Sequence, residues 1–159
     1  MKVFALALLM FLLLAKHTTA QNPLLRLKYD KVMIYGFQGG IGSDMSIVDE
    51  RGHLAKSVWG QAILNKEDVL VLTKKLGEKG SYGDEMAACF EPRMGLVYYL
   101  DNKIVAHLTI CLGCNIVTSS IPLDPKQNEK FSQNNNYFVG APTTTFNKYL
   151  KRLLKKYRI

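Results

Sequence analysis

Beyond its first 20 residues the sequence lacks an apolar run of the roughly 20 residues that a transmembrane helix needs. It also lacks the short motifs of several enzyme classes, because it contains no Gly-x-Ser-x-Gly and no His-Glu-x-x-His. The glycines of QGGIGSD are not followed by the Gly-Lys-Ser/Thr of a phosphate-binding loop, so they predict a turn. No pair of carboxylates falls on one expected face. The sequence therefore shows no complete catalytic constellation and favours a non-catalytic protein.

The first segment of the chain has the layout of a secretory signal peptide. A lysine at position 2 precedes the apolar run Val3–Ala15, and a short polar stretch follows that ends in the small residues Thr18-Thr19-Ala20. The apolar core is too short to span a bilayer comfortably, and a polar stretch with small residues is typical of a cleavage site. We therefore expect residues 1–20 to be a signal peptide, residues 21–159 to form a single domain, and the protein to be exported, either periplasmic or secreted.

The charge balance is basic. The chain has 21 Lys and Arg residues against 13 Asp and Glu residues, a formal net charge of +8. Cleavage after Ala20 would remove Lys2 and Lys16 and leave about +6 (19 against 13). This excess suits an anionic membrane surface or another envelope protein as a partner. Nucleic acid is not expected as a partner of an exported protein.

The chain beyond the leader predicts an α+β domain with a mostly antiparallel sheet of hairpins. Lys31–Phe37 (KVMIYGF) is rich in β-branched and aromatic residues and predicts a strand. Residues 45–60 predict a hairpin with its turn at Glu50–Gly52 and Trp59 at its far end.

A central helix is predicted to begin after Asn65. Asn65 is a suitable N-cap, and Asp68 stands where the reciprocal acidic residue of a capping box is found. The helix is expected to end at Gly77 or Gly80.

A second hairpin is predicted around Asp101-Asn102, a short turn signal between two apolar runs. A two-residue loop would pair Leu100 with Lys103 and place Tyr98 opposite Val105. The alternation then puts six apolar residues on one face: Val97, Tyr99, Ile104, Ala106, Leu108 and Ile110.

Only three cysteines occur in the chain, and this hairpin is expected to bring them together. Extending its ladder places Cys111 near Pro92 and Cys114 near Cys89. Residues three apart on a strand point to opposite faces, so Cys111 and Cys114 meet only if the chain turns, which Gly113 would allow. The sequence therefore predicts a three-cysteine cluster at the open end of the hairpin.

Three interpretations of this cluster stay open. An oxidising compartment favours a structural disulfide, joining Cys89 to Cys114 or to Cys111, or closing the CLGC loop, with one thiol left over. Three thiolates and a fourth ligand would instead hold zinc, although His107 lies about 13 Å along the strand and His53 on a distant hairpin. A redox-active pair is the third interpretation, with Arg93 supplying positive charge to a thiolate. No cofactor is expected beyond zinc.

The spaced motif Cys89-Phe90-x-Pro92-Arg93 … Ile110-Cys111-x-x-Cys114 resembles that of a group of small exported bacterial proteins. In both, an aliphatic-aromatic strand, a turn and a second strand separate the two halves, and the resemblance covers about residues 65–120. This chain has Met94 where the pattern carries His or Asn. The resemblance implies export and a single cysteine-based unit, and it implies no activity.

The chain closes with a predicted amphipathic helix. Its apolar residues are Phe146, Tyr149, Leu150, Leu153, Leu154 and Tyr157. Its opposite face carries Lys148, Lys151, Arg152, Lys155 and Arg158. The apolar face can dock on the sheet, with the cations complementing the helix dipole, or the helix can lie on an anionic surface.

Overall fold

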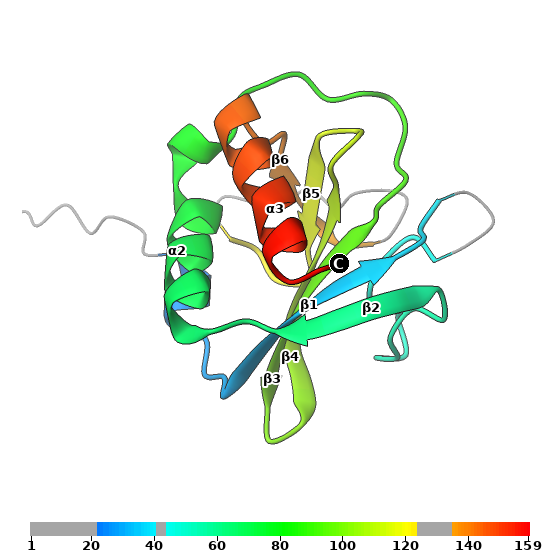
Figure 1. The fold of residues 1–159 in the computed structure, drawn as a ribbon, viewed down its shortest axis with the longest axis vertical. Helices are drawn as coiled ribbons and strands as arrows, with labels where there is room; N and C mark the ends of the chain where they lie inside the picture. Colours follow the sequence, from blue (N-terminus) through cyan, green and yellow to red (C-terminus); the bar gives the residue numbers. More distant parts are fainter. Residues whose placement is uncertain (1–21, 41–43, 124–134) are drawn as a thin grey trace, which may run out of the picture.

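The computed structural model describes residues 22–40, 44–123 and 135–159, so the predicted signal peptide lies outside the described residues. The fold is α+β, as predicted: one antiparallel sheet of six strands with two α-helices on one of its faces (Figure 1). The strand order is β2-β1-β3-β4-β5-β6. No described helix is long and apolar enough to cross a membrane.

The elements have the following bounds. The strands are β1 (Lys31–Phe37), β2 (Val58–Ile63), β3 (Met94–Leu100), β4 (Lys103–Cys111), β5 (Ile116–Ser119) and β6 (Tyr137–Gly140). The helices are α2 (Lys66–Gly77) and α3 (Thr144–Lys156), with short 3-10 helices η1 (Pro23–Leu25) and η2 (Lys79–Ser81).

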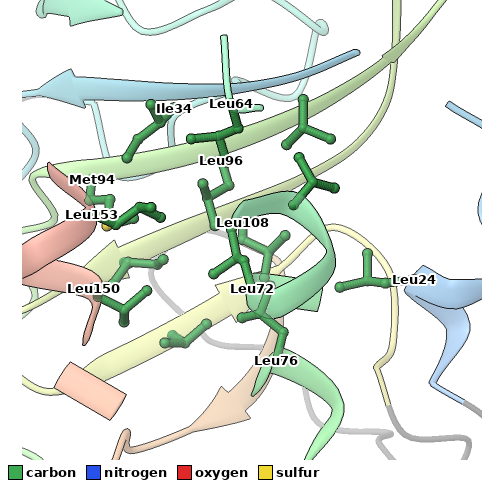
Figure 2. Packing of buried hydrophobic residues seen from close by; sticks show 14 of the residues in the cluster. Leu24, Ile34, Leu64, Leu72, Leu76, Met94, Leu96, Leu108, Leu150 and Leu153 are labelled. Carbon is green, nitrogen blue, oxygen red and sulfur yellow. The ribbon is translucent and has the colours of Figure 1, made fainter. Parts of the chain in front are cut away.

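The main core lies between the two helices and the sheet. Leu72 and Leu76 of α2 and Leu150 and Leu153 of α3 pack against strand residues such as Leu108, as Figure 2 shows. The opposite face of the sheet is covered by the segment between β1 and β2. A second buried cluster there contains Tyr35, Phe37, Ile47, Val48, Ala55, Val97 and Tyr99. Both predicted helices are therefore confirmed.

The hairpin turn is confirmed, but the predicted register beyond it is wrong. Asp101 and Asn102 both have positive φ (50° and 61°), as a two-residue type I′ turn requires. Leu100 pairs with Lys103, but the register then shifts so that Tyr98 faces Ala106 instead of Val105. A β-bulge inserts this extra residue, and no local sequence signal marks its position.

The bulge also corrects the predicted apolar face. Ala106, Leu108 and Ile110 face the helices, whereas Val97 and Tyr99 belong to the opposite cluster, against which Ile104 packs. A shift of one residue exchanges the faces of a strand, so the six residues are divided between two cores.

Of the hairpin predicted at residues 45–60, the turn is present, but the two segments beside it do not form a pair of strands. Asp49 accepts backbone hydrogen bonds from Arg51 and His53, and a single bridge joins Val48 to Leu54. Trp59 lies in β2, which pairs with β1. The local turn was predictable, but the pairing of β2 depends on a strand far away in the sequence.

The N-cap of α2 is confirmed, whereas its reciprocal half is not formed. Asn65 Oδ1 accepts a hydrogen bond of 2.8 Å from the Asp68 N–H. The Asp68 carboxylate instead accepts hydrogen bonds from Lys156 Nζ at 2.7 Å and from the Tyr157 hydroxyl. The Tyr157 hydroxyl in turn accepts the Asn65 N–H at 3.0 Å. These bonds tie the end of α3 to the start of α2.

Candidate functional site

The three cysteines lie together where β4 ends. Cys111 is the last residue of β4, Cys114 lies in the turn before β5, and Cys89 lies in the loop before β3. The Cα atoms of Cys89 and Cys114 are 5.7 Å apart, and those of Cys111 and Cys114 are 5.3 Å apart. Both separations suit a disulfide. The prediction that Cys89 and Cys114 lie close together is confirmed. An error of one residue in the predicted β3–β4 register still leaves the two cysteines near each other.

The turn that brings Cys111 and Cys114 together does not depend on Gly113 in the predicted way. Its left-handed residue is Asn115, with φ 59°, and a Cβ on Gly113 would meet no atom within 4 Å. Asn147 of α3 fixes the turn by donating hydrogen bonds of 3.0 Å to the Leu112 carbonyl and 3.1 Å to Asn115 Oδ1. The terminal helix therefore supports the cysteine cluster directly.

The backbone of Glu91 contacts both buried sulfurs. Its N–H donates to Cys114 Sγ at 3.4 Å, and its carbonyl lies 3.3 Å from Cys111 Sγ in the geometry of an S–H donor. The Cys114 N–H donates to Cys111 Sγ at 3.1 Å. Only 1 % of Cys111 and 2 % of Cys114 is exposed, whereas Cys89 is exposed to solvent.

Cys114 is the shared member of both close pairs. A sulfur forms one disulfide at a time, so a disulfide at Cys114 would join it to either Cys89 or Cys111 and leave the other as a thiol. The contact of Cys111 Sγ with the Glu91 carbonyl is a hydrogen bond only when Cys111 carries a proton. This contact suits the disulfide Cys89–Cys114 with Cys111 as the thiol, and the separation of Cys111 from Cys114 suits the alternative disulfide as well. The pairing of Cys89 with Cys111 is not one of the two close pairs.

A cavity of about 490 Å³ opens beside the cluster. Its lining residues are Cys89, Glu91, Arg93, Cys111, Leu112, Gly113, Cys114, Trp59, Leu154 and Ile159. Arg93, which was singled out from the sequence, lies with the three cysteines in this cavity. Trp59 of β2, Leu154 of α3 and Ile159 at the end of the chain were not foreseen as site residues. They come from distant parts of the sequence, and no local motif marks them.

Two residues that line the cavity, Trp59 and Ile159, pack directly on Gly36 of β1. A Cβ at Gly36 would lie 2.5 Å from Trp59 Cζ2 and 2.6 Å from Ile159 Cγ2. Any side chain there would displace the indole ring or the last residue of the chain. Trp59 nevertheless keeps 60 % of its surface exposed, so its ring forms one open wall of the cavity.

Neither candidate histidine lines the cavity. His107 is buried on β4, where burial lowers its pKa to about 4, and His53 pairs with Asp49 at the surface. Among residues 22–40, 44–123 and 135–159, no group of three or more His, Cys, Asp or Glu side chains has an arrangement suited to a metal ion. Zinc binding by Cys89, Cys111 and Cys114 stays a prediction.

The terminal helix docks by its apolar face. Phe146, Leu150 and Leu153 are buried in the main core, and Tyr149, Leu154 and Tyr157 pack against it. All five basic residues that were predicted to lie on the other face are exposed: Lys148, Lys151, Arg152, Lys155 and Arg158. The apolar face is therefore occupied by the protein itself, and the cationic face is left to solvent.

Comparison of the chain with protein family models, with curated proteins and with solved structures finds no match, so the resemblance drawn from the cysteine motif stays a prediction.

Proposed function

We propose that the protein is an exported, non-catalytic binding module whose ligand site is the cavity beside the cysteine cluster. The cavity carries this proposal, because about 490 Å³ falls within the usual size of small-molecule sites. A disulfide at Cys114 would hold one wall in place by joining the turn after β4 to a neighbouring segment.

The lining indicates the class of ligand. Trp59, Leu112, Leu154 and Ile159 offer apolar surface, and Arg93 offers a guanidinium at the same cavity. Pockets of this kind hold an apolar body and use a few polar groups to orient it. The ligand class that fits is a small molecule with an apolar or aromatic body and one anionic group directed at Arg93.

Binding of 8-anilinonaphthalene-1-sulfonate tests this proposal, because this probe combines an aromatic body with a sulfonate. Trp59 is the only tryptophan of the chain and lines the cavity, so its emission responds to a probe bound there. We expect the probe to quench Trp59 emission, with Arg93→Gln weakening the affinity about tenfold, the size expected for a charge-assisted hydrogen bond.

The matched control is Leu70→Asn, since Leu70 is 66 % exposed and does not line the cavity. This variant should bind the probe as the unaltered protein does. Equal affinity in the unaltered protein, Arg93→Gln and Leu154→Asn would show that the probe binds elsewhere, and would contradict the proposal.

A second proposal concerns the exposed cations of α3 and Arg158, which lies just beyond the end of α3. The five exposed basic side chains favour an anionic surface as partner, held by charge because the apolar face is docked. Each Lys or Arg near an anionic leaflet contributes about 1 kcal/mol. We expect the protein to co-sediment with phosphatidylglycerol vesicles at low salt and to be released by high salt.

Replacing Lys151, Arg152 and Lys155 together with Gln should reduce this vesicle binding at least tenfold. Replacing Lys31, Lys74 and Lys103 with Gln removes the same charge elsewhere and serves as the control. Binding that ignores salt, or that falls equally in both variants, would rule out a specific role for α3.

A further inference from the structure

The three sulfurs are arranged in series from solvent to core. Cys89 is exposed, while Cys114 and Cys111 are buried at 2 % and 1 % exposure. Cys114 lies within disulfide reach of both others, with Cα separations of 5.7 Å to Cys89 and 5.3 Å to Cys111. A structural disulfide needs only two cysteines. The third cysteine lies where it can react with a disulfide between the other two.

We propose that the disulfide exchanges between Cys89–Cys114 and Cys111–Cys114, which makes Cys89 a covalent acceptor site for disulfide-bearing ligands in the cavity. Exchange requires a thiolate next to the disulfide sulfur that it attacks. When Cys89 is bonded to Cys114, the Cys111 thiol lies next to Cys114 and contacts the Glu91 carbonyl. The acceptor site rests on the cavity of the proposed function, whereas the exchange itself depends only on the sulfur geometry.

The exchange step is balanced without an external oxidant. Cys111 loses its proton to water that enters the cavity it lines, and its thiolate attacks Cys114 Sγ. A bond forms between Cys111 and Cys114, the bond between Cys114 and Cys89 breaks, and Cys89 leaves as a thiolate that takes up a proton. The chain contains one disulfide and one thiol before and after the step.

Backbone donors assist both reacting sulfurs. The Cys114 N–H, 3.1 Å from Cys111 Sγ, stabilises negative charge on the attacking sulfur. The Glu91 N–H lies 3.4 Å from Cys114 Sγ and holds the central sulfur in place. The leaving Cys89 thiolate emerges into the cavity that Arg93 lines, where positive charge favours the thiolate form.

The exposed Cys89 thiolate then has a chemical use that a buried thiol lacks. It attacks one sulfur of a ligand R–S–S–R, forms the mixed disulfide Cys89–S–S–R and releases R–S⁻, which takes up a proton from water. The departing sulfur of the ligand is reduced to a thiol, and the Cys89 sulfur is oxidised to the mixed disulfide. Arg93 favours ligands that carry a carboxylate, so the substrate class is a small carboxylate-bearing disulfide, for which oxidised glutathione is the probe.

Peptide mapping of the oxidised protein tests the exchange. The protein is held at pH 8, quenched in acid so that thiolates cannot react further, and digested in acid. We expect both linkages, Cys89–Cys114 and Cys111–Cys114, in one preparation. Iodoacetamide should alkylate Cys89 and drive the whole population to Cys111–Cys114. A single linkage under all conditions, or alkylation confined to Cys111, would overturn the proposal.

Oxidised glutathione tests the acceptor site in the same protein. We expect one glutathione per chain, attached to Cys89, with the other two cysteines bonded. Cys111→Ser retains only Cys89 and Cys114, so its one disulfide is locked and it should lose glutathione attachment at least tenfold. Equal attachment in Cys111→Ser would contradict exchange. Probe binding by Trp59 emission reads the proposed binding function separately, so either result can fail without the other.

Discussion

Cys114→Ser is expected to destabilise the oxidised protein more than either other cysteine substitution, because it alone removes both disulfides that the geometry permits. The chain-entropy relation assigns about 3.5 kcal/mol to the bond Cys89–Cys114, whose ends are 25 residues apart. The same relation assigns about 2 kcal/mol to Cys111–Cys114, whose ends are 3 residues apart. Cys114 is also 2 % exposed, so a serine hydroxyl there adds a desolvation cost.

The three single variants should therefore form a series. Cys111→Ser keeps the longer loop and adds a buried hydroxyl that can donate to the Glu91 carbonyl, Cys89→Ser keeps only the shorter loop, and Cys114→Ser keeps neither and should lose most. Denaturant unfolding gives the free energies, and Cys114→Ala separates the lost bond from the buried hydroxyl. In a reductant, the difference between Cys89→Ser and the unaltered protein should shrink to that of a surface substitution.

Measurements on the same oxidised protein also distinguish the disulfide hypothesis from the zinc hypothesis. Intact mass and thiol counting on the oxidised protein should give one thiol per chain. Three thiols with stoichiometric zinc would establish the metal alternative, and a chelator would then destabilise the protein as strongly as Cys114→Ser. Equal stability of Cys114→Ser and Cys111→Ser would show that no disulfide at Cys114 stabilises the fold.

The features that sequence reasoning reached are local. The Asp101-Asn102 turn depends on residues that tolerate positive φ, and the cap of α2 depends on a side chain three residues from its donor. Because Leu100 pairs with Lys103, the cysteines on either side of the hairpin had to approach each other. A short turn thus determines a contact between Cys89 and Cys114.

The features that the sequence did not predict depend on residues that are distant in the chain. The bulge beyond Tyr99 is decided by packing on both faces of the sheet. The Asp68 carboxylate has a partner 88 residues away, Lys156, which a capping pattern cannot reveal. The cavity is assembled from β2, the loop before β3 and the end of α3, so its lining appears only when the sheet order and the docking of α3 are known.

His107 illustrates the same limit, and it carries the second large expected effect. Its position on β4 was clear from the sequence, but its burial was not: it faces Val97 and keeps 9 % of its surface exposed. Its Nδ1 is buried and lacks a hydrogen-bond partner among the described residues. Burial disfavours the imidazolium and lowers the pKa of His107 from 6.5 to about 4.

Stability should therefore fall in acid. Below about pH 6.5 the unfolded chain takes up a proton at this position that the folded protein does not accept until about pH 4. The contribution of His107 is complete above pH 6.5 and is lost between pH 6.5 and 4, at up to about 1.4 kcal/mol per pH unit and roughly 3 kcal/mol in all.

His107→Gln removes the titration, so its free energy of unfolding should decline less over this range. Leu70→Asn is the control, because it changes no titratable group at a side chain that is 66 % exposed, and it should leave the slope unchanged. Parallel pH profiles for the unaltered protein and His107→Gln would show that the folded protein accommodates the imidazolium, and would contradict a His107 buried in its neutral form.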